Sequence, residues 1–168
     1  MIELRPLTAE DVAEHNAGED EETVRWLSGE PGTFESTLSH FETLASNERR
    51  NAGKRGFGVW SDGRLAGYVD CDPDLPDLPG PNDVNIAYAV HPWARGRGVG
   101  AEAVQLMCEY IRRNRIGDRV VARIERENVA SVALVTRLGF EHIDDITSID
   151  DNDRDGEPVI YGVYALSL

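Results

Sequence analysis

Three glycines and two arginines stand together near the middle of the chain, in the segment Arg95-Gly96-Arg97-Gly98-Val99-Gly100. An alternating apolar segment, Val84 to Val90, precedes them, and an amphipathic segment from about Gly98 to Asn114 follows. Backbone N–H groups at the start of a helix attract anions, and glycines let a phosphate approach the main chain closely. The two arginines add positive charge. The segment therefore predicts a phosphate-binding turn between a strand and a helix.

Other glycine-rich phosphate-binding turns fit this segment less well. The dinucleotide-binding fingerprint requires a third glycine at position 101, which is Ala101, and an acidic residue about 20 positions further on in a parallel βαβ unit. The nucleotide-binding P-loop requires Gly-Lys-Ser or Gly-Lys-Thr, and the sequence contains neither. A glycine-rich loop that only turns the chain stays open as an alternative.

Two motifs carry a resemblance to a known family. Arg95-x-x-Gly98-x-Gly100, after Ala89-Val90-His91-Pro92, resembles the acetyl-CoA motif of the GNAT N-acetyltransferases. The segment from Asn128 to Phe140, which ends in Leu-Gly-Phe, is similar to their second signature. The resemblance implies an enzyme that moves an acetyl group from acetyl-CoA to a primary amine by direct attack. The acceptor would be the α-amine of a peptide N-terminus or the amine of a small molecule.

For acetyl-CoA, the resemblance implies a cleft between two diverging strands. The strand ending at Val90 would separate from the strand ending near Ile124, and pantetheine would lie between them. Backbone N–H groups from Arg97 to Ala101 would hold the pyrophosphate. Asn128 and Ser131 would face the pantetheine arm and the sulfur, although Asn128 could instead only cap its helix and Ser131 only pack. The implied cofactor-binding residues are Ala89, Val90, Arg95, Gly96, Arg97, Gly98, Val99, Gly100, Ala101, Asn128, Ser131 and Leu134.

The second signature also bears on the proton donor that the departing thiolate needs. Many GNAT enzymes place a tyrosine one residue after the position of Leu134, where this chain has Val135. A serine without the tyrosine resembles the branch of the ribosomal-protein-alanine N-acetyltransferases, in which a serine near the sulfur is the proposed acid. The resemblance therefore implies Ser131 as the catalytic acid.

Two polar residues are candidates for the group that accepts the proton of the amine. Asp70 lies near the end of its expected strand, and Asn85 lies on the strand that leads to Val90. Neither is a strong base, and Asp70 could instead be a solvated carboxylate. An α-amine with a pKa of about 7.7 to 8.0 is partly neutral near neutral pH, whereas a lysine amine at about 10.4 is almost fully charged. A weak base therefore favours an α-amine or a similar acceptor.

The charge of the chain favours a cationic acceptor. The formal net charge of -14 repels the phosphate backbone of nucleic acids, so no nucleic-acid partner is expected, although the acidic surplus could serve only solubility. In the GNAT family the first two helices usually select the acceptor, which implies Glu21, Glu22 and Trp26 as substrate-binding residues. The same acids could instead only complement a helix dipole.

Two alternatives to this acceptor and this activity stay open. Residues 22–30 and 155–161 resemble segments of aminoglycoside 6'-N-acetyltransferases, so an aminoglycoside or a polyamine is an alternative acceptor. The alternative of another class is a non-catalytic acyl-CoA-binding regulatory module, which the missing tyrosine and the weak base leave open.

The composition indicates a cytoplasmic globular protein. Hydrophobic residues make up 40% and charged residues 29% of the 168 residues, so neither disorder nor a membrane span is expected. The segment from Met1 to Pro6 lacks the features of a secretory signal, and Cys71 and Cys108 are expected to be buried thiols. No metal is expected, because the acidic segment 151–156 leads to Gly162, not glutamate, at the twelfth position of a calcium loop.

The order of the expected elements is β, α, α, β, β, β, α, β, α, β, β. This order and the short connections predict one α+β domain, residues 1–168, and the resemblance implies that it has the GNAT fold. Its centre would be a mostly antiparallel mixed sheet of about seven strands, flanked by about four helices. A homodimer is expected only from the family resemblance.

Three local features are expected to shape this fold. A helix from Thr33 is expected to bury Phe34, Leu38, Phe41 and Leu44, which recur at helical spacing. Asp62-Gly63 is expected to turn a β-hairpin. The strand after Phe140 is expected to end near Ile146, before an acidic loop.

Overall fold

The structure, a computed structural model, describes residues 1–153 and 155–168 and is built on one seven-stranded sheet. The strands lie in the order β1-β2-β3-β4-β5-β7-β6. Neighbouring strands are antiparallel except β4 and β5, which are parallel. The predicted α+β fold with a mostly antiparallel mixed sheet is confirmed. The strands are β1 Ile2–Arg5, β2 Arg55–Ser61, β3 Arg64–Asp72, β4 Asp83–Val90, β5 Arg119–Glu125, β6 Glu141–Asn152 and β7 Pro158–Ser167.

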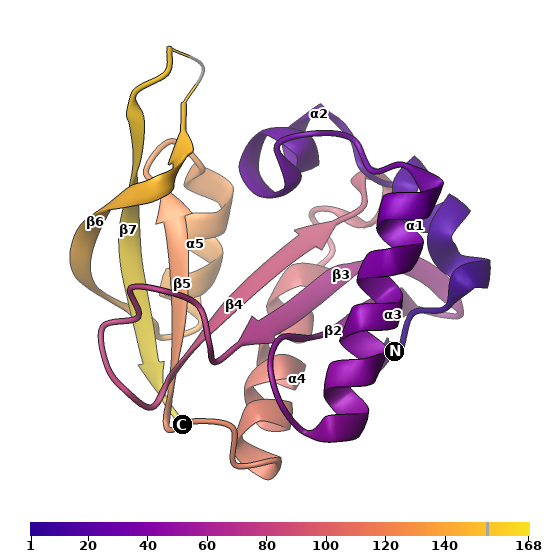
Figure 1. The fold of residues 1–168 in the computed structure, drawn as a ribbon, viewed down its shortest axis with the longest axis horizontal. Helices are drawn as coiled ribbons and strands as arrows, with labels where there is room; N and C mark the ends of the chain where they lie inside the picture. The colour runs from indigo at the N-terminus through magenta and orange to yellow at the C-terminus, as the bar shows by residue number, and fades with distance from the viewer. Residues whose placement is uncertain (154) are drawn as a thin grey trace.

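Helices cover both faces of the sheet. Figure 1 shows α1 and α3 on one face of the central strands and α4 on the other, with α5 beside β5 and α2 above the end of β4. Short 3-10 turns cover Ala9–Asp11 and Pro92–Ala94, and a π-helical turn, Val24–Ser28, continues α2. The helices are α1 Val12–Ala17, α2 Glu21–Thr23, α3 Phe34–Arg50, α4 Val99–Arg113 and α5 Val129–Arg137.

The hairpin between β2 and β3 forms at the predicted turn. Asp62 and Gly63 both have positive φ angles, 50° and 84°, and Ser61 pairs with Arg64 across them. A two-residue hairpin turn with positive φ at both positions matches the twist of the flanking strands. The prediction of a β-hairpin at Asp-Gly is confirmed.

The long helix α3 buries only part of its predicted apolar face. Phe41 and Leu44 are buried, and Leu38 is partly buried against the same cluster. Phe34 is 55% exposed, so its prediction as a core residue is wrong. It is the first helical residue after the cap Thr33, at an end of α3 where Glu35 and Ser36 are also exposed.

The strand β6 is longer than the sequence predicts. It continues past Ile146 to Asn152, and Asn152 pairs with Pro158 of β7. The prediction of a loop after Ile146 is wrong for residues 147–152. Thr147 pairs with Ile160 and Asn152 with Pro158, and residues 148–151 form an irregular stretch between these two pairs. An irregular edge strand needs no alternating apolar side chains, so the sequence pattern does not show it. Arg154 lies outside the described residues.

The strands β4 and β5 pair over a short distance and then diverge. Their pairing is limited to Asp83–Asn85 with Arg119–Val121. Arg119 holds this end of the pairing, because its Nε and Nη2 donate to the buried carboxylate of Asp83 at 2.8 and 2.7 Å. The rest of β4, as far as Val90, pairs with β3 alone. The edge of β4 that faces β5 is therefore open towards its carboxyl end, as the family resemblance implies.

The crossover helix α4 packs on the apolar face of this sheet. Its predicted inner residues Val104, Met107, Cys108 and Ile111 are all buried. They lie in one cluster with residues of β2, β3, β4 and β5.

The burial of Met107, which is 0% exposed, predicts a large loss of stability on truncation. Met107→Ala is expected to lower the free energy of unfolding by about 2–5 kcal/mol, since it removes buried contacts and leaves a cavity. Urea unfolding followed by circular dichroism measures this loss. Gln105→Ala, at an exposed position of the same helix, is the control and should change stability by less than about 0.5 kcal/mol. Equal effects of the two substitutions would contradict the assignment of Met107 to the core.

Candidate active site

A cleft of about 590 Å³ opens between the free end of β4, the starts of α4 and α5, and α2. All residues that the resemblance implies for acetyl-CoA line this cleft except Arg97, which is exposed. The open end of β4 contributes Tyr88, Ala89 and Val90 to its wall. The cleft thus joins a free strand edge to the amino-terminal end of a helix.

The glycine turn at the start of α4 has a backbone that favours glycine. Gly96 and Gly98 have positive φ angles of 71° and 81°, and a Cβ at either position would meet no atom within 4 Å. Gly98 is the N-cap of α4, and no side chain caps the helix there. Gly100 is packed instead, since a Cβ there would lie 2.9 Å from a methyl carbon of Leu134. The turn presents backbone N–H groups to an open space.

Arg95 is held by acidic side chains of α2 and its cap. Its guanidinium contacts both carboxylate oxygens of Asp20, at 2.6 and 2.7 Å, and lies 3.0 Å from Glu22. Its Nε donates to the carbonyl of Val90. The hydrogen bond from Arg95 holds the pKa of Asp20 well below its usual range. Acidic side chains of the protein therefore compensate the positive charge that Arg95 was expected to add to the anion site.

A tyrosine and a serine meet inside the cleft. The hydroxyl of Tyr88, from β4, lies 2.6 Å from Oγ of Ser131, from α5. Burial raises the pKa of Tyr88. Asn128 caps α5, where its side-chain oxygen accepts from the backbone N–H of Ser131 at 3.3 Å. Tyr88 is not among the site residues predicted from the sequence. The sequence offered one signal for it. A polar aromatic residue stands two positions before the end of the strand that leads to the glycine turn.

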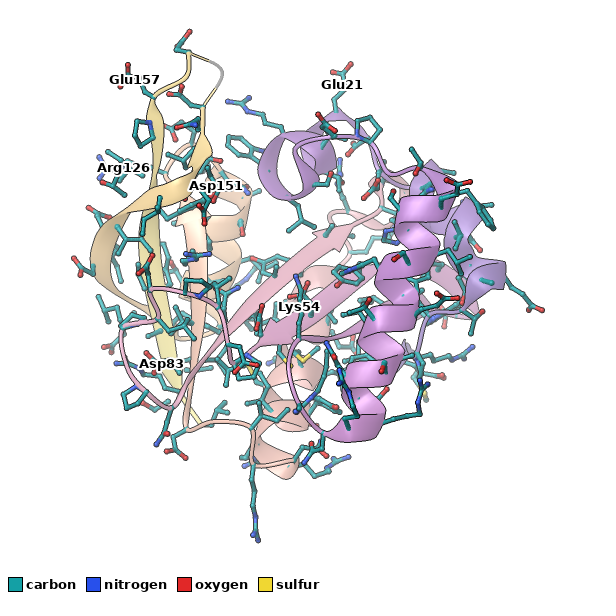
Figure 2. All side chains as sticks on the ribbon, in the orientation of Figure 1. Glu21, Lys54, Asp83, Arg126, Asp151 and Glu157 are labelled. Atoms are coloured by element: carbon teal, nitrogen blue, oxygen red, sulfur yellow. The ribbon has the colours of Figure 1, made fainter. Side chains whose placement is uncertain are left out.

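A second cavity, of about 390 Å³, lies on the other face of β4 and shares Thr23 and Ala89 with the cleft. Asp70 lines this cavity and not the cofactor cleft. Asp70 was predicted as a catalytic base because its side chain was expected to point into the cleft. Asp70 is 2% exposed, so it is not a solvated carboxylate. Its Oδ2 accepts from Tyr68 Oη at 2.8 Å and lies 2.9 Å from Lys54 Nζ. Figure 2 shows Lys54 in front of the central strands, beside α3.

Asn85 lies apart from both sites. It belongs to the paired part of β4, opposite Asp72, and lines neither the cleft nor the second cavity. Its side-chain oxygen is buried and has no hydrogen-bond partner among the described residues. The structure therefore places Asn85 outside both cavities, on the same face of β4 as Ala87, which pairs with Asp70.

The residues proposed for acceptor binding divide between two surfaces. Glu22 and Trp26 line the cofactor cleft, and the ring of Trp26 is stacked on the guanidinium of Arg25. Glu21 lines a wide groove of about 1040 Å³ between α2 and the ends of β5, β6 and β7. Figure 2 labels Glu21 on one side of this groove and Asp151 and Glu157 on the hairpin opposite. The carboxylates that line the groove are Glu19, Asp20, Glu21, Glu125, Glu127, Asp145, Asp153 and Asp155.

Comparison with known proteins assigns the family. The family model for the GNAT acetyltransferase domain matches residues 2–141. No curated protein matches the sequence. The chain belongs to the GNAT acetyltransferase family, which makes it an acetyltransferase and confirms the predicted family and enzyme class.

Solved structures share the fold at low sequence identity. A complex of the aminoglycoside acetyltransferase AAC(6')-Ib with coenzyme A and kanamycin is 16% identical, with a TM-score of 0.78 over 99% of this chain and 95% of that chain. RimJ from Mycobacterium smegmatis, with CoA-disulfide, is 20% identical, with a TM-score of 0.80 over 99% and 81%. The ribosomal-protein-alanine N-acetyltransferase from Brucella melitensis is 21% identical, with a TM-score of 0.77 over 99% of both chains.

The described residues form neither a metal-binding cluster nor a membrane-spanning helix. Among residues 1–153 and 155–168, no group of three or more His, Cys, Asp or Glu side chains could hold a metal ion. No helix in that part of the chain is long and apolar enough to cross a membrane.

The buried ring of His15, which lines the second cavity, predicts a pH dependence of stability. Burial lowers the pKa of His15 to about 4, below its ordinary value of 6.5. Between these values the unfolded chain binds a proton that the native protein does not, so the native state loses stability as the pH falls. At pH 5 this loss amounts to about 2 kcal/mol relative to pH 7.

Urea unfolding at pH 7 and pH 5 tests this dependence. His15→Gln removes the titrating ring, so the variant should lose about 2 kcal/mol less than the wild type between the two pH values. His142→Gln, at an exposed histidine of β6, is the control and should retain the full loss. An unchanged pH dependence in His15→Gln would show that His15 titrates normally.

Proposed function

We propose that this acetyltransferase binds acetyl-CoA in the cleft beside β4 and transfers the acetyl group directly to a primary amine. The observation that carries the proposal is the divergence of β4 from β5, which leaves a strand edge open beside the glycine turn. Unpaired backbone groups on that edge can bind the amide groups of pantetheine. The backbone N–H groups at the start of α4 suit the pyrophosphate, since a helix N-terminus favours anions. The comparison structures that hold coenzyme A support this placement.

The pair of Ser131 and Tyr88 would protonate the departing thiolate. Both hydroxyls lie in the cleft, 2.6 Å apart, where the sulfur of the cofactor is expected. Positioned general acids typically contribute about 10²–10⁴-fold to a rate. In this assignment, Tyr88 takes the role of the tyrosine that many members of the family have at the position of Val135.

The acceptor would be an α-amine of a peptide N-terminus or of a small molecule. The resemblance to the ribosomal-protein-alanine N-acetyltransferases supports a peptide. A second candidate is a cationic small molecule such as an aminoglycoside or a polyamine. The wide groove with its eight carboxylates favours this candidate, because acids that face one groove attract a substrate with several positive charges.

The remaining assignments rest on sequence and charge. We propose that residues 1–168 act as one domain in the cytoplasm, without a metal and without a nucleic acid or a membrane as partner. A homodimer remains a prediction from the family. Acetyl-CoA would be a co-substrate that is consumed in each turnover.

Gly98→Trp is expected to abolish acetyl-CoA binding, since its side chain would fill the open space above the turn at the start of α4. Isothermal titration calorimetry with acetyl-CoA measures the affinity. Gly63→Trp is the matched control, because Gly63 also has a positive φ angle and open space but lies in the distant β2–β3 turn. Wild-type affinity in Gly98→Trp would show that the cofactor site is assigned wrongly.

Release of free CoA from acetyl-CoA tests the transfer itself. The purified protein is assayed with N-terminal peptides, aminoglycosides, polyamines and amino acids. Turnover on peptides would favour the α-amine acceptor, and turnover on polycations would favour the acidic groove. Acetyl-CoA binding without amine-dependent release would contradict the proposed transfer and support the regulatory module.

The roles of the two hydroxyls can be separated by kinetics. Tyr88→Phe and Ser131→Ala are each expected to lower kcat by about 10–100-fold and to leave the affinity for acetyl-CoA nearly unchanged, because each removes one member of the proton-donating pair. Thr136→Val is the control, since the hydroxyl of Thr136 is exposed on the same helix. If kcat stayed normal in both variants, neither hydroxyl would act as the acid.

A further inference from the structure

The second cavity lies opposite the cofactor cleft because β4 carries small residues on that face. Tyr68 and Asp70 of β3 pair with Ala89 and Ala87 of β4, and paired residues of antiparallel strands point to the same face. The two alanines leave space beside the larger polar side chains. Ala89 lines both cavities, so this space reaches the strand edge along which pantetheine is proposed to lie.

Asp70 presents one carboxylate oxygen without a partner in this cavity. Oδ2 is engaged by Tyr68 and Lys54, whereas Oδ1 is fully buried and has no hydrogen-bond partner among the described residues. A buried carboxylate oxygen without a partner is costly, and this cost favours a donor from a ligand.

The charges around the cavity suit a positively charged group. Glu19, Glu30 and Asp70 face it, and Lys54 is its one cation within the described residues at neutral pH. The other titratable groups that line it are Tyr68 and the rings of His15, His40 and His91. Burial lowers the pKa values of His15 and His91, so these rings stay uncharged. The cavity therefore has an excess of negative charge.

We propose that this cavity binds the acceptor as a compact ammonium with a single positive charge, such as an α-amine with a small side chain, and that Oδ1 of Asp70 takes a proton from it. The inference rests on the proposed acetyl transfer. Burial raises the pKa of Asp70, against the opposing effects of Lys54 and Tyr68, which makes this carboxylate a better base than an exposed one. A volume of about 390 Å³ has room for such an amine.

The protons balance in this scheme. The ammonium gives one proton to Asp70, and the neutral nitrogen attacks the thioester carbon. As the tetrahedral intermediate collapses, the carbon–sulfur bond breaks and the thiolate takes a proton from the Tyr88–Ser131 pair. The nitrogen loses its second proton, which restores that pair. Asp70 releases its proton to solvent when the acetylated product leaves.

The pH dependence of kcat/KM for alaninamide in Asp70→Asn provides a direct test. The wild-type profile should be bell-shaped, because it needs ionised Asp70 and the protonated amine. Asp70→Asn can use only amine that is already neutral. Its kcat/KM should be about 10²-fold lower than the wild-type value at pH 7. As the pH rises through the pKa of the amine, kcat/KM of the variant should increase, whereas that of the wild type should decrease. Asparagine has nearly the same shape, and Lys54 is 38% exposed and can turn to water, so the variant should fold.

Two further variants make the test specific. Asp72→Asn lies on the same strand and face, outside the cavity, and should behave as the wild type. Ala87→Leu fills the cavity without touching a charge, and should raise KM for alaninamide while acetyl-CoA affinity is unchanged. A normal profile in Asp70→Asn, or a normal KM in Ala87→Leu, would overturn the proposal.

A binding measurement separates this proposal from the proposed function. Calorimetry with alaninamide in the presence of CoA should show binding to the wild type that is about tenfold or more weaker in Asp70→Asn, because a charge-assisted hydrogen bond is lost. Equal binding to both proteins would overturn the assignment of Asp70. If the wild type binds alaninamide through Asp70 but releases no CoA, the proposed acetyl transfer is contradicted. The assignment of Asp70 to an amine-binding site is then still supported.

Discussion

The short pairing of β4 with β5 is the constraint on which both proposed binding sites depend. Three residue pairs join the strands, and the ion pair of Asp83 with Arg119 holds the paired end. Backbone polar groups need partners, and a strand that loses its neighbour on one side must find them in water or in a ligand. The loss of pairing therefore turns an interior strand into a binding edge. The crossover helix α4 begins just beyond this edge, so its N–H groups lie next to the exposed strand.

The alternation of side chains along β4 then separates donor from acceptor. Tyr88 points towards α5 and its Ser131, whereas Ala87 and Ala89 face Asp70 and Tyr68. Two substrates that approach from opposite faces can meet at the edge of one strand. Such an arrangement needs no covalent acetyl-enzyme intermediate, since the amine reaches the thioester directly. Positioning and proton transfer are what the protein must supply.

Local patterns predicted most of the fold, and long-range contacts limited the prediction of the site. The Asp62-Gly63 turn and the glycines before α4 depend on backbone conformations that the sequence shows directly. The length of β6 depends on pairing with β7, which side-chain periodicity does not show. Tyr88 meets Ser131 across 43 positions of sequence, and Asp70 meets Lys54, which precedes β2. Such pairs need the fold to be known before they can be recognised.

The ion pairs of Arg95 link the two binding regions mechanically. Arg95 belongs to the turn that follows β4, and Asp20 caps α2, which borders both the cofactor cleft and the acidic groove. Any displacement of the turn on cofactor binding is passed to α2 through this contact. Thermodynamic linkage is reciprocal, so a change in acceptor affinity caused by acetyl-CoA is matched by an equal change in acetyl-CoA affinity caused by the acceptor. Arg95 is thus the contact through which occupancy of one binding region can change the affinity of the other.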